Sequence, residues 1–283
     1  GDTKYTAVDG TVDLKKAIIR KFQNENNLDY SLDEIIVSAG CKQSIFNFLQ
    51  VIIDDGDEVI IPQPYWVSYA DMVKYSGGKP IMLSTNYEDN FSIDINKFES
   101  LITERTKLFM INSPNNPSGK NYDTEMLIKL SEVLKKYNNV FISSDDIYEH
   151  INYGTEHVSF ASIEGMYDRT ITVNGIAKAF AMTGWRIGYL GAPIWIAKAC
   201  TKLQGQVTSG ANCIAQRATI EAITESPEKI KYMVKEFEQR KNLIIKLLGE
   251  IKGFQLNNPD GACLLYTSPS PRDRTRSRMP SSA

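Results

Sequence analysis

Histidine is almost absent from this 283-residue sequence, which contains only His150 and His157. Metal sites in proteins draw on clustered histidine and cysteine, and the four cysteines here are far apart and form no Cys-x-x-Cys pair. The sequence therefore predicts no metal site and no disulfide framework, and its thiols are expected to be reduced and structural. Lysine, tyrosine and carboxylate side chains are left to carry any chemistry.

Long apolar runs and an excess of charge are missing as well. No run approaches the roughly 20 apolar residues that a membrane-spanning helix needs, and the polar start lacks the apolar core of a signal peptide. The formal net charge of -2 gives no reason to expect nucleic acid or a membrane as partner. We therefore expect a cytoplasmic protein that acts on small molecules.

What the sequence does contain is a regular alternation of short apolar runs with amphipathic stretches. β-branched and apolar residues gather at 35–37, 59–61, 108–111, 140–142 and 171–173. Helical spacing of apolar residues appears between them, as in residues 14–22 and in residues 127–134 after an expected cap at Asp123 or Thr124. This alternation predicts an α/β fold with a mainly parallel sheet flanked by helices.

Three parts are expected along the chain. Residues 1–226 carry the alternating pattern and are expected to form one large domain. Residues 227–263 begin with a long charged helix over 227–248 and open a small domain that is truncated. Residues 264–283 are rich in Ser, Pro and Arg without periodicity, which favours a non-native or disordered tail, such as translated vector or a frameshift, over a basic nucleic-acid-binding tail.

Lys178 lies among small and apolar residues just after a β-run, in the segment VNGIAKAFAMTGWRIGY at 173–189. Burial lowers the pKa of a lysine and favours the free amine, the form that condenses with an aldehyde. Taken alone, Lys178 would be interpreted as a surface lysine with a buried stem. Arg186 favours the functional interpretation of Lys178 over a surface lysine, because a fixed cation nearby suits a ligand that carries a phosphate.

Four other segments follow predicted strands. The acids of VFISSDDIYEH (140–150) come where α/β sheets place ligands, although an isolated Asp-Asp pair is usually a solvated turn. SAGCKQ (38–43) leaves helix-start N–H groups free for an anion, although such turns are common. Turn chemistry explains most of NSPNNPSG (112–119), and core packing is the usual fate of aromatics such as those in PYWVSY (64–69).

Residues 174–189 closely resemble the lysine signature of class I and II aminotransferases, especially the bacterial aspartate and prephenate aminotransferases. The similarity runs to about residue 262. It implies the large domain of a fold type I enzyme with pyridoxal 5'-phosphate as cofactor. The implied reaction moves an amino group between an amino acid, with aspartate as the expected donor, and a 2-oxo acid such as 2-oxoglutarate.

The resemblance assigns the covalent and phosphate contacts of the cofactor. Lys178 is the catalytic residue and holds pyridoxal phosphate covalently. Arg186 binds the phosphate of the cofactor. The backbone of Gly40, Cys41 and Lys42 completes the phosphate cradle.

The resemblance also assigns the contacts to the ring. Asp145 pairs with the pyridine nitrogen, which keeps the ring an electron sink, and Tyr148 and Asn116 bind the phenolic oxygen. Trp66 stacks on the ring, and Trp66 and Asn116 also contact the substrate. By the same resemblance Tyr5 reaches the phosphate site of a neighbouring subunit, which implies a homodimer. The alternative interpretation of Tyr5 is a frayed terminal aromatic.

Other functions stay open at this point. A carbon-sulfur lyase or an aminocyclopropane-carboxylate-forming enzyme of the same fold would keep the cofactor residues but differ in product. A non-catalytic regulator would need a helix-turn-helix segment, and none is visible. A cofactor-binding but inactive fragment is the third alternative, because the family's carboxylate-binding arginine lies in the region expected to be missing. The family more often has Glu at the position of Asp146, and no catalytic consequence is expected from that difference.

Overall fold

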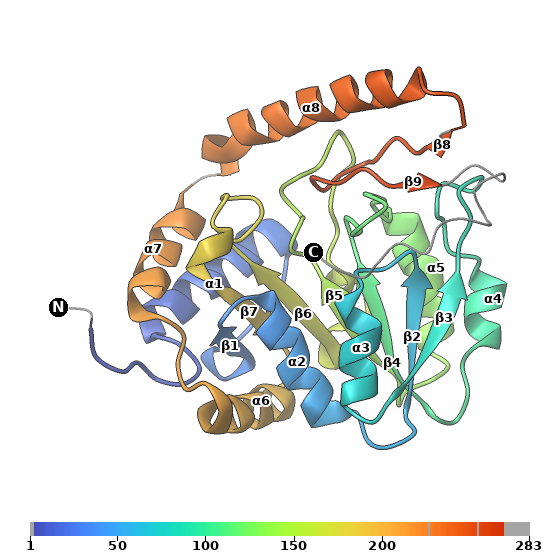
Figure 1. Ribbon diagram of the computed structural model, residues 1–283. Coiled ribbons are helices and arrows are strands. Elements are labelled where there is room, and N and C mark those ends of the chain that lie inside the picture. Colours follow the sequence, from blue (N-terminus) through green and yellow to red (C-terminus); the bar gives the residue numbers. More distant parts are fainter. Residues whose placement is uncertain (1–2, 226, 254, 269–283) are drawn as a thin grey trace.

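The structure, a computed structural model, describes residues 3–225, 227–253 and 255–268. Within these residues the centre is a seven-stranded sheet with the order β1-β7-β6-β5-β4-β2-β3 (Figure 1). The strands are Ile35–Ser38 (β1), Glu58–Gln63 (β2), Lys79–Ser84 (β3), Thr106–Asn112 (β4), Phe141–Asp145 (β5), Thr170–Gly175 (β6) and Gly188–Gly191 (β7). Strand β7 is antiparallel to both neighbours, and the other pairs are parallel. The predicted mainly parallel α/β sheet is confirmed.

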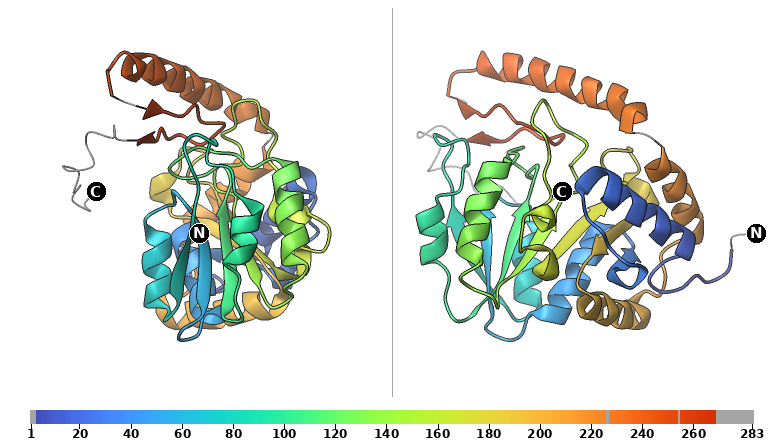
Figure 2. Two further views of the ribbon diagram at one scale, coloured as in Figure 1. Left: turned by 90° about the vertical axis from the view of Figure 1, so that its right-hand side faces the viewer. Right: turned by 180° about the vertical axis from the view of Figure 1, so that it is seen from behind.

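Helices cover both faces of the sheet. Their bounds are Val12–Asn26 (α1), Cys41–Ile52 (α2), Ser68–Tyr75 (α3), Ile95–Ser100 (α4), Thr124–Leu134 (α5), Ile194–Val207 (α6), Cys213–Thr224 (α7) and Lys231–Gly249 (α8). Helices α2, α3 and α6 pack on one face. Helices α1, α4, α5 and α7 pack on the other, as the view from behind in Figure 2 shows.

Strand β2 shows why the predicted strands read as continuous apolar runs. Successive side chains of a strand point to opposite faces, so Val59 and Ile61 pack in the cluster under α2 and α3, and Ile60 packs under α4 and α5. A parallel sheet with helices on both faces buries every position of such a strand. All five predicted runs coincide with strands of the sheet, except that Val140 lies just before β5.

Two strands of the sheet were not predicted from the sequence. Strand β3 lies at an edge, has mostly half-buried or exposed residues and contains Pro80, so it lacks a continuous apolar run. Strand β7 begins and ends with glycine, which is depleted in strands. Gly188 is nevertheless required there, because a Cβ atom on it would lie 2.2 Å from the backbone nitrogen of Cys41.

The expected helix boundaries are largely confirmed. Asp123 caps α5, since its side chain accepts a hydrogen bond from the Met126 N–H. The helix expected over 227–248 begins with a 3₁₀ turn, Pro227–Ile230, and continues as α8. Figure 1 shows α8 above the carboxyl ends of the parallel strands. No helix among the described residues is long and apolar enough to cross a membrane.

The end of the described chain forms a short hairpin beneath α8. Strand Gln255–Leu256 (β8) pairs antiparallel with Thr267–Ser268 (β9), and Tyr266 packs edge-on against Phe91 at 5.8 Å between ring centroids. The first residues of the expected non-native tail therefore make contacts with the fold. Residues 269–283 of that tail lie outside the described residues.

Candidate active site

A pocket opens at the carboxyl edge of the parallel strands, where Asn112 ends β4, Asp145 ends β5 and Lys178 lies in the loop after β6. Strand order brings these segments together, as expected for ligand sites in α/β sheets. The pocket is lined by Cys41, Lys42, Trp66, Tyr69, Asn112, Asn116, Asp145, Ile147, Tyr148, Ala177, Lys178 and Arg186. Eight of the ten residues that the sequence nominated are in this lining, and Gly40 lies directly beside it.

Asp145 is the buried acid of the pocket. Burial raises the pKa of its carboxyl group to about 6, and a hydrogen bond from Tyr69 and one from the backbone N–H of Ile147 act in the opposite direction. The donor-acceptor distances are 2.5 Å from Tyr69 Oη and 3.4 Å from the Ile147 nitrogen. Asn112 Nδ2 fixes the backbone carbonyl of Asp145 at 2.7 Å. The acid is therefore held in one orientation at the end of its strand.

Tyr69 is a site residue that the sequence did not reveal. It lies in α3, on the apolar side of an amphipathic helix, where a tyrosine normally indicates core packing. Its hydroxyl reaches Asp145 only because β2 and β5 lie on either side of β4. The available signal was its position as the last residue of the aromatic segment 64–69, which also contains Trp66.

Lys178, Tyr148 and Asn116 form a second group in the pocket. The Lys178 amine lies 5.5 Å from the centroid of the Tyr148 ring, and Asn116 Nδ2 donates to Tyr148 Oη at 3.5 Å. Burial raises the pKa of Tyr148, so the phenol keeps its proton at neutral pH. A primary amine thus stands beside two hydrogen-bonding groups that can bind an oxygen atom.

An anion cradle forms where α2 starts. The N-terminal N–H groups of a helix have no acceptor within the helix, and α2 begins at Cys41 directly after Gly40. The Arg186 guanidinium lies against this start and donates to the carbonyl oxygens of Thr183 at 2.9 Å and Ala39 at 3.4 Å. Gly40 has a φ of +88°, and a Cβ atom on it would lie 2.3 Å from Arg186 Nη2.

Cys41 is the first residue of α2, so its backbone N–H lies at the helix start. Its thiol donates to the carbonyl oxygen of Asn174 at 3.1 Å, and burial raises the pKa of the thiol. A thiolate does not form readily under these conditions. The prediction that this cysteine is structural agrees with its surroundings.

Of two further residues predicted from the sequence, Trp66 lies in the pocket and Tyr5 lies outside it. Trp66 lines the pocket, meets Tyr69 edge-on at 5.3 Å between ring centroids, and has the Lys42 amine 4.8 Å from its own ring centroid. Tyr5, in contrast, is 97% exposed and lies outside the pocket. This chain therefore does not bring Tyr5 to its own Lys178.

The donor set of the pocket fits pyridoxal phosphate. Lys178 offers an amine for the aldehyde, and Asp145 offers a carboxylate for the ring nitrogen. Tyr148 and Asn116 can bind the phenolic oxygen, and the helix start with Arg186 can bind the phosphate. Each functional group of the cofactor thus has a chemically matched partner.

Comparisons with known proteins agree with this geometry. The family model "Aminotransferase class I and II" matches residues 1–279. A bifunctional aspartate aminotransferase and glutamate/aspartate-prephenate aminotransferase of Petunia hybrida is 43% identical over 94% of this chain and 56% of its own length. A probable aspartate/prephenate aminotransferase of Rhizobium leguminosarum is 46% identical over 95% of this chain and 68% of its own length.

Solved structures give the same result. The crystal structure of the aspartate aminotransferase from Rhizobium meliloti superposes with a TM-score of 0.90 at 45% identity, over 93% of this chain and 66% of that one. The chain therefore spans between about half and two thirds of the length of these relatives. The family match, the fold and the pocket agree, and the chain belongs to the class I and II aminotransferases.

Proposed function

We propose that the protein containing this chain is a pyridoxal-phosphate-dependent aminotransferase that moves an amino group between aspartate and a 2-oxo acid such as 2-oxoglutarate. One observation carries the proposal: Lys178, Asp145 and Arg186, far apart in sequence, line a single pocket. The aspartate and prephenate aminotransferase names of the relatives support the choice of substrates. Bound pyridoxal phosphate would supply an electron sink for the carbanion at the substrate Cα.

The roles of the pocket residues follow from their chemistry. Lys178 is proposed to hold the cofactor covalently and, as a free amine, to take and return the proton at the substrate Cα. Asp145 is proposed to keep the ring nitrogen protonated, since an ionised carboxylate within a buried site favours a cation beside it. Tyr148 and Asn116 orient the ring, and Trp66 covers it while contacting the substrate.

The phosphate cradle is proposed to fix the other end of the cofactor. Arg186 carries a permanent positive charge next to the N–H groups of Gly40, Cys41 and Lys42. An anion bound there gains from the guanidinium and from the helix dipole together. This anchor would hold the ring in place while Lys178 is released.

The covalent assignment can be tested on the full-length protein. Borohydride reduction after addition of pyridoxal phosphate should fix the label on the peptide that contains Lys178, and Lys178→Ala should abolish both the label and the visible absorbance. Lys129→Ala is a matched control, because Lys129 is an exposed lysine of α5. A label on another lysine, or unchanged absorbance in Lys178→Ala, would contradict the proposal.

The reaction itself is tested by product analysis. Incubation with aspartate and 2-oxoglutarate should give oxaloacetate and glutamate with ping-pong kinetics. Release of a sulfide or a cyclised product from suitable amino acids would instead favour a lyase or cyclopropane-forming enzyme. Binding of the cofactor without turnover in the full-length protein would favour an inactive cofactor-binding protein.

We also propose a homodimer, a cytoplasmic location and two domains. An exposed Tyr5 is available for the phosphate site of a second subunit, which supports the dimer. Cys41, Cys200 and Cys263 are free thiols, and free thiols are usual in a reducing compartment. Residues 1–226 are proposed as the large domain and 227–263 as the start of the small one, since α8 has no buried residue among those described. Crosslinking of a Tyr5→Cys variant would test the dimer.

A further inference from the structure

Three acids at the end of β5 and just after it are buried: Asp145, Asp146 and Glu149. Asp145 lines the pocket, and Asp146 follows it directly and is completely buried. Consecutive residues of an extended chain point to opposite sides, which explains why Asp146 is absent from the pocket lining. A buried carboxylate is costly unless a cation or hydrogen-bond donors compensate it. Each of the three acids therefore needs partners.

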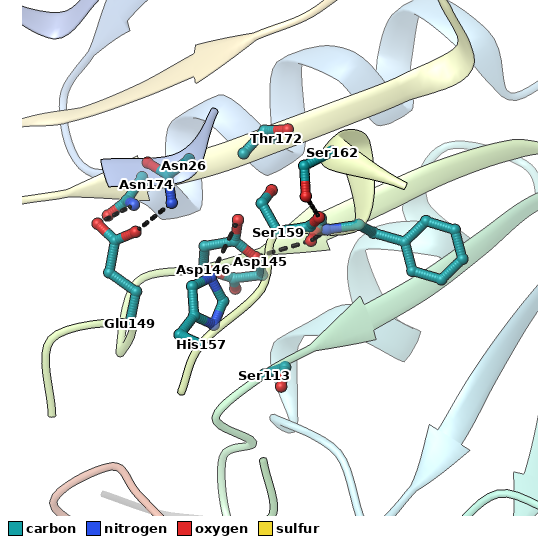
Figure 3. Close-up of polar contacts among 12 residues, drawn as sticks. Asn26, Ser113, Asp145, Asp146, Glu149, His157, Ser159, Ser162, Thr172 and Asn174 are labelled. Atoms are coloured by element: carbon teal, nitrogen blue, oxygen red, sulfur yellow. Dashed lines mark hydrogen bonds and ion pairs between the residues drawn. The ribbon is translucent and has the colours of Figure 1, made fainter. Parts of the chain in front are cut away.

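Glu149 has its partners in full. It forms a buried ion pair with Lys21 of α1, and it accepts hydrogen bonds from Asn26 at 2.8 Å and Asn174 at 2.7 Å (Figure 3). Burial alone would raise the pKa of Glu149, but Lys21 and the histidines His150 and His157 outweigh it and hold this pKa well below its usual range. Glu149 is thus a stable anion.

Asp146 is only half satisfied by hydrogen bonds. Its Oδ1 accepts a hydrogen bond from Ser144 Oγ at 2.7 Å, but its Oδ2 has no hydrogen-bond partner among the described residues. His157 Nε2 lies 3.6 Å from that oxygen (Figure 3). The side chain of His157 is only 7% exposed, and neither ring nitrogen has a hydrogen-bond partner in the described part of the chain.

The groups around His157 favour its charged form. Burial acts to lower the pKa of the imidazole and Lys21 acts in the same direction, but Asp146 and Glu149 outweigh them, and the pKa is raised. An imidazolium at this place compensates the unsatisfied oxygen of Asp146. A neutral imidazole would leave two adjacent buried acids without this compensation, and the charge of Asp146 raises the pKa of Asp145.

We propose that His157 is a positioning residue for Asp145: its buried imidazolium neutralises Asp146 and so keeps the neighbouring carboxylate of Asp145 ionised. The inference rests on the proposed function, because that function gives the Asp145 carboxylate its task. His157 is not among the residues that line the pocket, and it is proposed to act on Asp145 through Asp146. His157 and Asp146 thus support the site from outside the pocket lining.

The charge of His157 can be measured without cofactor. In the full-length protein labelled with ¹⁵N-histidine, His150→Asn and His157→Gln assign the two imidazoles of this part of the chain. At about pH 7.5, where an ordinary histidine is mostly neutral, both ring nitrogens of His157 should have the shifts of an imidazolium. A neutral His157 would overturn the proposal, whatever the protein does with its cofactor.

The effect on Asp145 is measured by cofactor affinity across pH. His157→Gln keeps a hydrogen-bond donor but removes the charge, so the acid limit of pyridoxal phosphate binding should move upward by about one pH unit, which is about tenfold in affinity below that limit. The double variant Asp146→Asn with His157→Gln removes both charges and should restore the wild-type profile. His150→Asn serves as the matched histidine control, because His150 bonds Glu25 rather than Asp146.

The outcomes separate this inference from the proposed function. A shifted profile that the double variant restores supports the charge pairing. Unchanged binding in His157→Gln, or a loss that the double variant does not restore, shows a merely structural role and overturns the inference while the proposed function stands. Failure of the wild-type protein to bind pyridoxal phosphate overturns the proposed function, and the histidine shifts then still show whether the charge pair exists.

Discussion

The phenol of Tyr69 donates a 2.5 Å hydrogen bond to Oδ2 of Asp145 and so connects helix α3 to the end of strand β5. This contact opposes the effect of burial, which raises the pKa of Asp145 to about 6. Tyr69 therefore helps to set the pH at which the acid of the pocket is ionised.

Replacing Tyr69 with Phe should raise the pKa of Asp145 further. A hydrogen bond to a charged group contributes about 1.5–3 kcal/mol, which corresponds to an upward shift of about one to two pH units in the acid limit of cofactor binding. Titration of pyridoxal phosphate affinity against pH measures the shift. Tyr122→Phe is the control, because Tyr122 is a buried tyrosine outside this pocket. An unchanged acid limit of cofactor binding in Tyr69→Phe would show that Tyr69 does not affect the ionisation of Asp145.

Wild-type affinity for pyridoxal phosphate should fall as the pH falls through about 6, because the carboxyl of Asp145 then takes up a proton. The raised pKa has the opposite effect on the cofactor-free fold. When the pKa of an acid is higher in the folded state than in the unfolded state, the folded state binds the proton more tightly. The free energy of unfolding therefore increases as the pH falls from above 6 toward about 3.9. Asp145→Asn should flatten both dependences. Affinity that stays constant across this range in the wild type would contradict the assignment.

Gly40→Ala should disrupt the phosphate cradle. The added Cβ would lie 2.3 Å from Arg186 Nη2, and the φ of +88° is unfavourable for any other residue. We expect at least about tenfold weaker binding of pyridoxal phosphate, since misplacing a bidentate cation costs more than about 1.4 kcal/mol. Gly184→Ala is the matched control, because a Cβ there meets nothing within 4 Å. Equal affinities in the two variants would show that the phosphate binds elsewhere.

Lys21→Met should destabilise the fold strongly, because it leaves the buried carboxylate of Glu149 without its main cation. Removing one partner of a buried ion pair costs about 3–5 kcal/mol. Urea denaturation of the full-length protein measures the loss. Lys129→Met breaks an exposed pair with Glu125 and should leave the free energy of unfolding nearly unchanged. Similar losses of the free energy of unfolding in both variants would mean that the buried pair with Glu149 stabilises the fold no more than an exposed pair does.

Much of the fold was readable from the sequence, because burial on both faces of a parallel sheet leaves continuous apolar runs. The runs at 59–61 and 108–111 lie in β2 and β4, which have a neighbouring strand on each side. Strand β7 could not be predicted from the sequence, because glycine is depleted in strands. Its two glycines allow close approaches, of Gly188 to Cys41 and of Gly191 to Tyr30. Such approaches arise only when segments distant in the sequence meet.

The site divides in the same way. By itself the sequence determined the local motifs, such as Lys178 after a strand and a small-residue turn before α2, since these depend on neighbouring residues and on helix ends. Only the tertiary structure decided how the two adjacent acids differ, with Asp145 paired to Tyr69 and Asp146 facing His157. The physical reason is that alternation sends the two side chains to opposite sides of the chain, where the order of the strands supplies different neighbours.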